Sequence, residues 1–169
     1  MKLLFFITIA LLACVVVMTS NIKKTFLQEH NRLRKKHGAK NLKWDQTLAD
    51  FAQDFCDKLA ETNKFEHNDE AKTKGYGENL FKSFGSASNP GGFPDAAVNA
   101  WYQEINDYNF NNPGFSYKTG HFTQVVWNSS KKLGCGMATK ASSTWICCNY
   151  NPAGNINTVE EFEANVFKP

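Results

Sequence analysis

The feature that most constrains this fold is a pair of segments near the C-terminus that only four residues separate. Apolar or small side chains predominate in residues 133–139 and 144–150, and residues 140–143 between them are suited to a turn. This pattern predicts two antiparallel strands joined as a hairpin. If Thr139 faces Thr144, then Cys135 faces Cys148, at a cross-strand distance that allows a disulfide.

The neighbouring cysteine, Cys147, must point to the opposite face of the same strand, because side chains alternate along a strand. Two alternatives remain for it. It forms a disulfide with Cys56, which lies on a predicted buried helical face, or Cys56 and Cys147 are two separate buried thiols.

Residues 1–20 have the pattern of a secretory signal peptide. Lys2 precedes an apolar run over residues 3–18 in which Thr8 is the one polar residue. This run is shorter than the ~20 residues that a membrane-spanning helix requires. We expect cleavage within residues 18–21, which removes Cys14 and leaves four cysteines for disulfides in a secreted chain. An uncleaved anchor is the alternative, and the residues up to Cys14 also partly resemble a bacterial lipoprotein box.

The rest of the chain, residues 21–169, is predicted to form one domain, since 42% of all residues are hydrophobic and 14% are aromatic. Residues 22–37 have apolar side chains at helical spacing, and Gly38 is suited to the C-cap. The other face of this helix is predicted to be basic: Lys23, Lys24, Arg32, Arg34, Lys35 and Lys36. This face either is simply solvated or attaches weakly to an anionic membrane or glycan.

Further elements follow from spacing. Asp45 is predicted to cap a second helix with a buried stripe that includes Leu48 and Cys56. A strand is predicted over residues 80–84, then a loop over 85–92, then a helix from Pro94 that places Glu104 on the same face as Trp101. For residues 120–127, which begin with Gly120 and His121, periodicity does not decide between helix and strand.

Several of these segments together resemble the CAP superfamily of cysteine-rich secretory, antigen 5 and pathogenesis-related 1 proteins. Residues 120–127 match its first signature and residues 148–155 most of its second, while residues 30–34 and 77–80 are similar to its His-Asn-x-x-Arg and Gly-Glu-Asn elements. Residues 101–105 are most similar to the Golgi-associated pathogenesis-related branch. Members of that branch typically lack a signal peptide, so the leader is a departure.

The resemblance implies an α+β fold: a three-layer α/β/α sandwich around a three-stranded antiparallel sheet. It also implies a cleft formed by His67, Glu78, Glu104 and His121. Imidazole and carboxylate groups suit Zn²⁺ or another divalent cation, so we hypothesise that the histidines bind the metal while the glutamates orient them or hold a metal-bound water. Alternatives are a buried polar network without metal and a glycosidase that uses the two carboxylates.

The resemblance further implies a loop that binds lipid. Tyr108, Phe110 and Phe115 have the Φ-x-Φ-x₄-Φ spacing of sterol-binding CAP proteins. We predict that these rings bind a sterol or fatty acyl chain; the alternative is that they pack into the domain.

We therefore predict a secreted, extracellular, non-catalytic lipid-binding protein, a monomer or weak dimer without an obligatory cofactor. The alternatives are an immune-interacting or venom-allergen-like recognition protein with an extracellular protein partner, and a metal-dependent hydrolase. The sequon at Asn128 predicts one glycan. A net charge of only +3 and the lack of a basic–aromatic motif argue against nucleic-acid binding.

Overall fold

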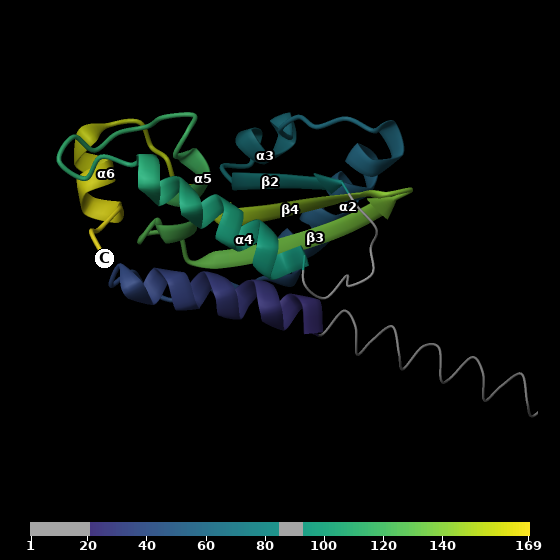
Figure 1. The fold of residues 1–169 in the computed structure, drawn as a ribbon, viewed down its shortest axis with the longest axis horizontal. Helices are drawn as coiled ribbons and strands as arrows, with labels where there is room; N and C mark the ends of the chain where they lie inside the picture. The colour runs from purple at the N-terminus through teal and green to yellow at the C-terminus, as the bar shows by residue number, and fades with distance from the viewer. Residues whose placement is uncertain (1–20, 85–92) are drawn as a thin grey trace, which may run out of the picture.

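A four-stranded sheet separates two helical layers in the computed structural model, which describes residues 21–84 and 93–169 (Figure 1). The strands are β1 (Lys43–Trp44), β2 (Gly77–Phe84), β3 (Lys132–Lys140) and β4 (Ser143–Asn151), in the spatial order β1-β3-β4-β2. The predicted signal peptide with Cys14 and the predicted loop over residues 85–92 lie outside the described residues.

The α/β/α sandwich and its antiparallel core are confirmed, but the sheet has four strands rather than three. β3 and β4 pair with Thr139 opposite Thr144 and Cys135 opposite Cys148, which is the register that the loop length predicted. The additional strand, β1, is parallel to β3 and pairs at only two positions, Lys43 with Lys132 and Trp44 with Leu133. A strand this short leaves no alternation in the sequence by which it could be recognised.

The two faces of the sheet carry different cores. One face packs against the helix over residues 21–36 and α4 (Phe93–Gln103); its fully buried residues include Phe26, Trp101 and Tyr150. The other face packs against α2 (Gln46–Thr62), around Trp145 and Cys147. Figure 1 shows α4 in front of the sheet and α2 behind it.

Helix α2 begins and packs as its sequence predicts. Asp45 is the N-cap, and its carboxylate accepts a hydrogen bond of 3.1 Å from the backbone N–H of Leu48. The whole predicted stripe is buried: Leu48, Ala49, Ala52, Phe55, Cys56 and Leu59. A Cβ at Gly134 or Gly136 on β3 would overlap the α2 backbone, so these glycines allow the helix to lie directly on the strand.

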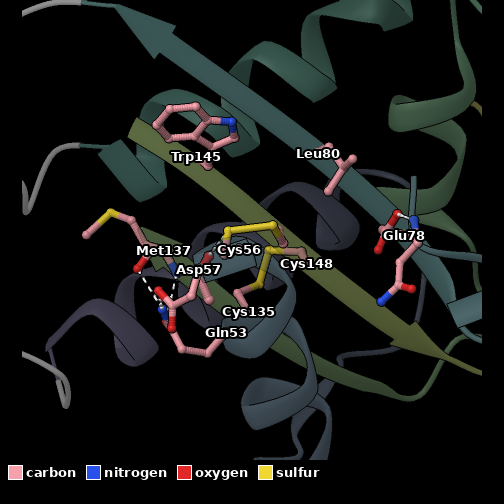
Figure 2. Close-up of a disulfide and its surroundings, with 12 residues drawn as sticks. Gln53, Cys56, Asp57, Glu78, Leu80, Cys135, Met137, Trp145 and Cys148 are labelled. Carbon is pink, nitrogen blue, oxygen red and sulfur yellow. Dashed lines mark hydrogen bonds between the residues drawn. A yellow bond between two sulfur atoms is a disulfide. The ribbon is translucent and has the colours of Figure 1, made fainter. Parts of the chain in front are cut away.

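Two disulfides join α2, β3 and β4 (Figure 2). Cys135–Cys148 crosses the hairpin as predicted. Cys56–Cys147 connects α2 to the opposite face of β4, which decides between the two alternatives for this pair in favour of the disulfide. Adjacent residues of β4 are therefore bonded covalently to two different neighbours.

Arg34 corrects the predicted basic face of the helix over residues 21–36. The side chain is fully buried and donates to the backbone carbonyls of Lys40, Val125, Trp127 and Ser130, at 2.7 to 3.1 Å. The other five basic residues of that predicted face are exposed. Burial lowers the pKa of Arg34 to about 10, so the guanidinium remains charged at neutral pH.

The remaining helices are short. They are α3 (Asp69–Thr73), the 3₁₀ helix η2 (Glu104–Asp107), α5 (Gly120–Val126) and α6 (Val159–Asn165). The segment whose periodicity was ambiguous is thus helix α5. Within residues 21–84 and 93–169, we find no helix with the length and apolar character needed to span a membrane.

Candidate functional site

A cleft of about 270 Å³ lies where β2, α5 and the loops before α3 and α5 meet. Three of the four predicted site residues line it, namely His67, Glu78 and His121. The fourth, Glu104, forms a hydrogen bond with the His121 side chain. Residues that are up to 54 positions apart in the sequence are therefore gathered at one surface hollow.

His121 and Glu104 form the first of two histidine–glutamate pairs. His121 is the second residue of α5, and its Nδ1 lies 2.7 Å from Glu104 Oε1. The other oxygen, Oε2, accepts the backbone N–H groups of His121 at 3.0 Å and of Phe122 at 3.1 Å. Because Thr119 makes no side-chain cap bond, Glu104 caps α5 and fixes the imidazole at the same time.

His67 and Glu78 repeat this arrangement. His67 Nδ1 lies 2.8 Å from Glu78 Oε1, which also accepts the backbone N–H of Asn68, the N-cap of α3, at 2.9 Å. The Glu78 side chain is only 5% exposed, whereas that of His67 is 66% exposed. The hydrogen bond to Glu78 raises the pKa of His67 above its usual value, with burial opposing this effect.

Both pairs leave the same ring atom available. In the neutral imidazole, an Nδ1–H that donates to a carboxylate leaves Nε2 as the lone-pair nitrogen. Of the Glu78 oxygens, the buried Oε2 has no hydrogen-bond partner among the described residues. Two oriented imidazoles therefore line the cleft, and Glu78 beside them keeps one buried carboxylate oxygen without a partner among the described residues.

A buried network holds the floor of this cleft. The Asn79 amide Nδ2 donates to the backbone carbonyl of His121 at 3.1 Å and to the Tyr150 hydroxyl at 3.2 Å. The hydroxyl in turn lies 2.8 Å from His30 Nε2 on the N-terminal helix. The Trp101 ring lies nearly parallel to the His121 ring, with 6.3 Å between their centroids. His121 is thus contacted by Asn79 of β2 and Trp101 of α4, and Tyr150 of β4 holds Asn79.

The two pairs have the donor chemistry that divalent cations use, namely imidazole nitrogens backed by carboxylates. A histidine whose Nδ1–H donates to a carboxylate binds metal through Nε2, which is the arrangement of both pairs. Within the described residues, no group of three or more His, Cys, Asp or Glu side chains is already gathered closely enough to hold a metal ion.

The three rings of the predicted lipid-binding loop do not form one surface. Tyr108 is buried, and Phe110 packs on it with 4.9 Å between ring centroids; both rings also contact Phe122. Phe115 is 39% exposed, lines the cleft and packs edge-on against Tyr117, which is 93% exposed. Phe115 is thus the most exposed of the three rings, Phe110 is half-buried, and ligand binding by this loop stays a prediction.

The predicted glycosylation site lies in a tight turn. Asn128 is half-buried, and its Oδ1 accepts the backbone N–H of Lys40 at 3.2 Å. The hydroxyl of Ser130, the third residue of the sequon, is buried and donates to Pro152 O at 2.9 Å. The glycan at Asn128 stays a prediction.

The structure adds residues to the cleft that were not predicted as site residues. Asn79, Tyr117, Gly120 and Asn155 also line it. Asn79 follows Glu78 in the Gly-Glu-Asn element, and Asn155 ends the second signature, so the motifs contained a signal for both.

A family model, curated relatives and solved structures all match this chain. The model of the cysteine-rich secretory protein family, CAP, matches residues 27–150. Golgi-associated plant pathogenesis-related protein 1 of Homo sapiens is 39% identical over 144 residues, which cover 85% of this chain and 90% of that protein. Secreted protein RBT4 of Candida albicans is 34% identical over 149 residues, covering 83% of this chain and 37% of that protein. A crystal structure of NaASP2 with Zn²⁺ superposes with a TM-score of 0.71 at 26% identity and covers 85% of each chain.

Proposed function

The chain belongs to the cysteine-rich secretory protein family, and from this premise we propose that it is a secreted, non-catalytic binding module whose cleft binds a divalent cation. The observation that carries the proposal is the pair of carboxylate-backed imidazoles, His67 with Glu78 and His121 with Glu104. The solved structure of NaASP2 with Zn²⁺, a relative by fold and sequence, supports Zn²⁺ as the first ion to test.

His67 and His121 would hold the ion through Nε2, and Glu78 and Glu104 would keep each ring in the required tautomer and orientation. When bound, the ion would supply a positive charge and exchangeable water positions to ligands that enter the cleft. The exposed ring of Tyr117 and the half-exposed ring of Phe115 lie at the same cleft and would provide apolar contact for such a ligand.

Isothermal titration with Zn²⁺ at neutral pH tests this proposal. We expect the wild-type protein to release heat on binding and His121→Ala to abolish it. Glu104→Gln should weaken binding by roughly 10–100-fold, the range for residues that orient a metal ligand. The matched control is Glu66→Gln, an exposed carboxylate next to His67. Heat that is the same in the wild type and His121→Ala would instead favour a polar network without metal.

Lipid binding is a second candidate function, supported by two exposed apolar regions. The first is the Phe115–Tyr117 ring pair at the cleft. The second is a groove of about 510 Å³ whose lining includes Ile22, Trp44 and Met137. Both offer apolar side chains to a sterol or fatty acyl chain, beside polar residues such as Asp50 in the groove and Asn79 in the cleft.

Radiolabelled cholesterol distinguishes the two regions. Phe115→Ala should reduce binding if the ligand lies at the cleft, and Trp44→Ala should reduce it if the ligand lies in the groove. Binding that neither variant changes would contradict both locations. Phe110→Ala is unsuitable as a test, because this ring packs on Tyr108 and Phe122 and its loss would disturb the core.

The proposal of secretion is supported by the two disulfides, which persist in oxidising compartments, and by the name of the relative RBT4, a secreted protein. Expression in a eukaryotic host tests it: we expect the chain in the medium, lacking its leader and with all four remaining cysteines unreactive to a thiol reagent. Retention in the cells with free thiols would contradict it. Chelator-sensitive turnover of a substrate in the same preparation would favour the alternative, a metal-dependent hydrolase.

A further inference from the structure

The outer edge of β3 is protected by a side chain rather than by a strand. β3 has nine residues, and β1 pairs with it only at Lys132 and Leu133. In the part of the chain that the structure describes, no strand pairs with the rest of this edge. An edge with free backbone N–H and C=O groups is a template for pairing with another chain.

Gln53 occupies this edge at Met137. Its Oε1 accepts the Met137 backbone N–H at 2.9 Å, and its Nε2 donates to the Met137 carbonyl, also at 2.9 Å. Figure 2 shows both bonds, which form the closed pair that a residue of a neighbouring strand would make. We propose that Gln53 acts as a substitute strand residue that keeps the edge of β3 from pairing with another chain.

Two features hold the carboxamide in place. Asp57, one turn along α2, accepts the second Nε2 hydrogen at 3.0 Å, so the amide cannot rotate without losing three hydrogen bonds. Gly136 brings the helix within reach, because a Cβ at this position would overlap the backbone of Gln53. The sequence spacing between Gln53 and Met137 gives no sign of this contact.

The edge is accessible to a second chain. The groove that contains Gln53 and Met137 is open, and its other lining residues include Trp44 and Ile22. In a solution of the pure protein, the partner that can pair with this edge is the β3 edge of a second copy. Antiparallel pairing of two such edges is symmetric and closes as a dimer.

Gln53→Met tests the proposal, because methionine has a similar length but can neither donate nor accept these bonds. The matched control is Gln46→Met on the same helix. Gln46 donates to Asp50, four residues on, just as Gln53 donates to Asp57, but its Oε1 accepts the Trp44 indole N–H at 3.2 Å and not a backbone N–H of β3.

Two measurements are needed. Hydrogen exchange should show the Met137 amide protected in the wild type and in Gln46→Met, and exchanging roughly ten-fold faster in Gln53→Met, which corresponds to the loss of one hydrogen bond. Analytical ultracentrifugation over a concentration series should then show that Gln53→Met associates at concentrations where the wild type and the control do not. If Gln53→Met does not fold by near-UV circular dichroism, Gln53→Ala is used in the same way.

Two results would overturn the proposal. The first is a Met137 amide in the wild type that exchanges as fast as in Gln53→Met, which means that the carboxamide does not close the edge. The second is a folded variant that has lost protection at Met137 but associates no more than the wild type, which means that the open edge does not attract a second chain.

Discussion

At the scale of single residues, His30 is a buried base that the fold keeps neutral. Its Nδ1 lies 2.8 Å from the Phe26 carbonyl and its Nε2 2.8 Å from the Tyr150 hydroxyl, so the ring donates at one nitrogen and accepts at the other. Burial lowers its pKa from the usual 6.5 to about 4. This single side chain connects the N-terminal helix to the network under the cleft.

We predict that His30 makes the protein less stable in mild acid. Between pH 6.5 and 4 the unfolded chain takes up a proton at this residue and the folded chain does not. The free energy of unfolding therefore decreases as the pH is lowered through this range, by up to about 3 kcal/mol. Urea titrations at several pH values should show this slope, and His30→Gln should flatten it. His67→Gln is the contrasting control, since the pKa of His67 is shifted in the opposite direction. A slope that His30→Gln leaves intact would contradict the assignment.

Arg34 is the second residue on which the fold depends. Arg34→Met removes the donors for the backbone carbonyls of Lys40, Val125, Trp127 and Ser130, the last three in α5 and the turn after it. It should cost about 3–5 kcal/mol, because each buried acceptor left unpaired costs about 1–3 kcal/mol. Arg32→Met, two residues earlier and exposed, should cost less than about 1 kcal/mol. Thermal and chemical denaturation of the two variants give the comparison; equal losses would mean that the buried hydrogen bonds contribute little.

At the scale of elements, the contact of α2 with β3 depends on glycine. A Cβ at Gly134 would overlap the backbone of Leu48 and Ala49, so Gly134→Ala must displace the helix or the strand. We expect a loss of about 3 kcal/mol, the upper end of the range for overpacking. Gly114→Ala is the control, because a Cβ there meets no atom within 4 Å. Near-equal stability of the two variants in denaturant would show that the layers can separate without cost.

The elements also show which parts of the structure could be predicted from the sequence alone. The hairpin register and the buried stripe of α2 follow from local spacing and were predicted residue by residue. The inward direction of Arg34 was not, because its acceptors lie up to 96 residues away and no local pattern marks them. The pairing of His67 with Glu78 could be expected from the family resemblance, but the capping of α5 by Glu104 depends on where η2 begins in space.

At the scale of the whole molecule, charge is divided unevenly. Residues 21–43 contain eight basic residues and one acidic residue, whereas residues 44–169 contain ten and fifteen. Lys131, which is also exposed, lies next to this segment, because the Lys43 backbone N–H donates to the Lys131 carbonyl at 2.9 Å. Exposed positive charge is thus concentrated in residues 21–43 and at Lys131.

We predict salt-dependent binding to anionic vesicles through this basic segment. Sedimentation with phosphatidylserine-containing vesicles should capture the protein at low ionic strength, and about 0.5 M salt should release it, because exposed charges are then strongly screened. The double variant Lys35→Glu/Lys43→Glu should bind far less, while Lys72→Glu/Lys118→Glu, with the same change in charge elsewhere, should bind nearly as well. Equal losses in both would indicate a response to net charge alone.

The placement of the disulfides has a consequence for survival among proteases. The residues of the two histidine–glutamate pairs, His67, Glu78, Glu104 and His121, lie between Cys56 and Cys135, inside a covalent ring that the Cys56–Cys147 bond closes. One peptide-bond cut anywhere between Cys56 and Cys147 opens this ring without releasing a fragment. A molecule nicked once would therefore still carry both histidine–glutamate pairs on one covalent unit while the Cys56–Cys147 bond is intact.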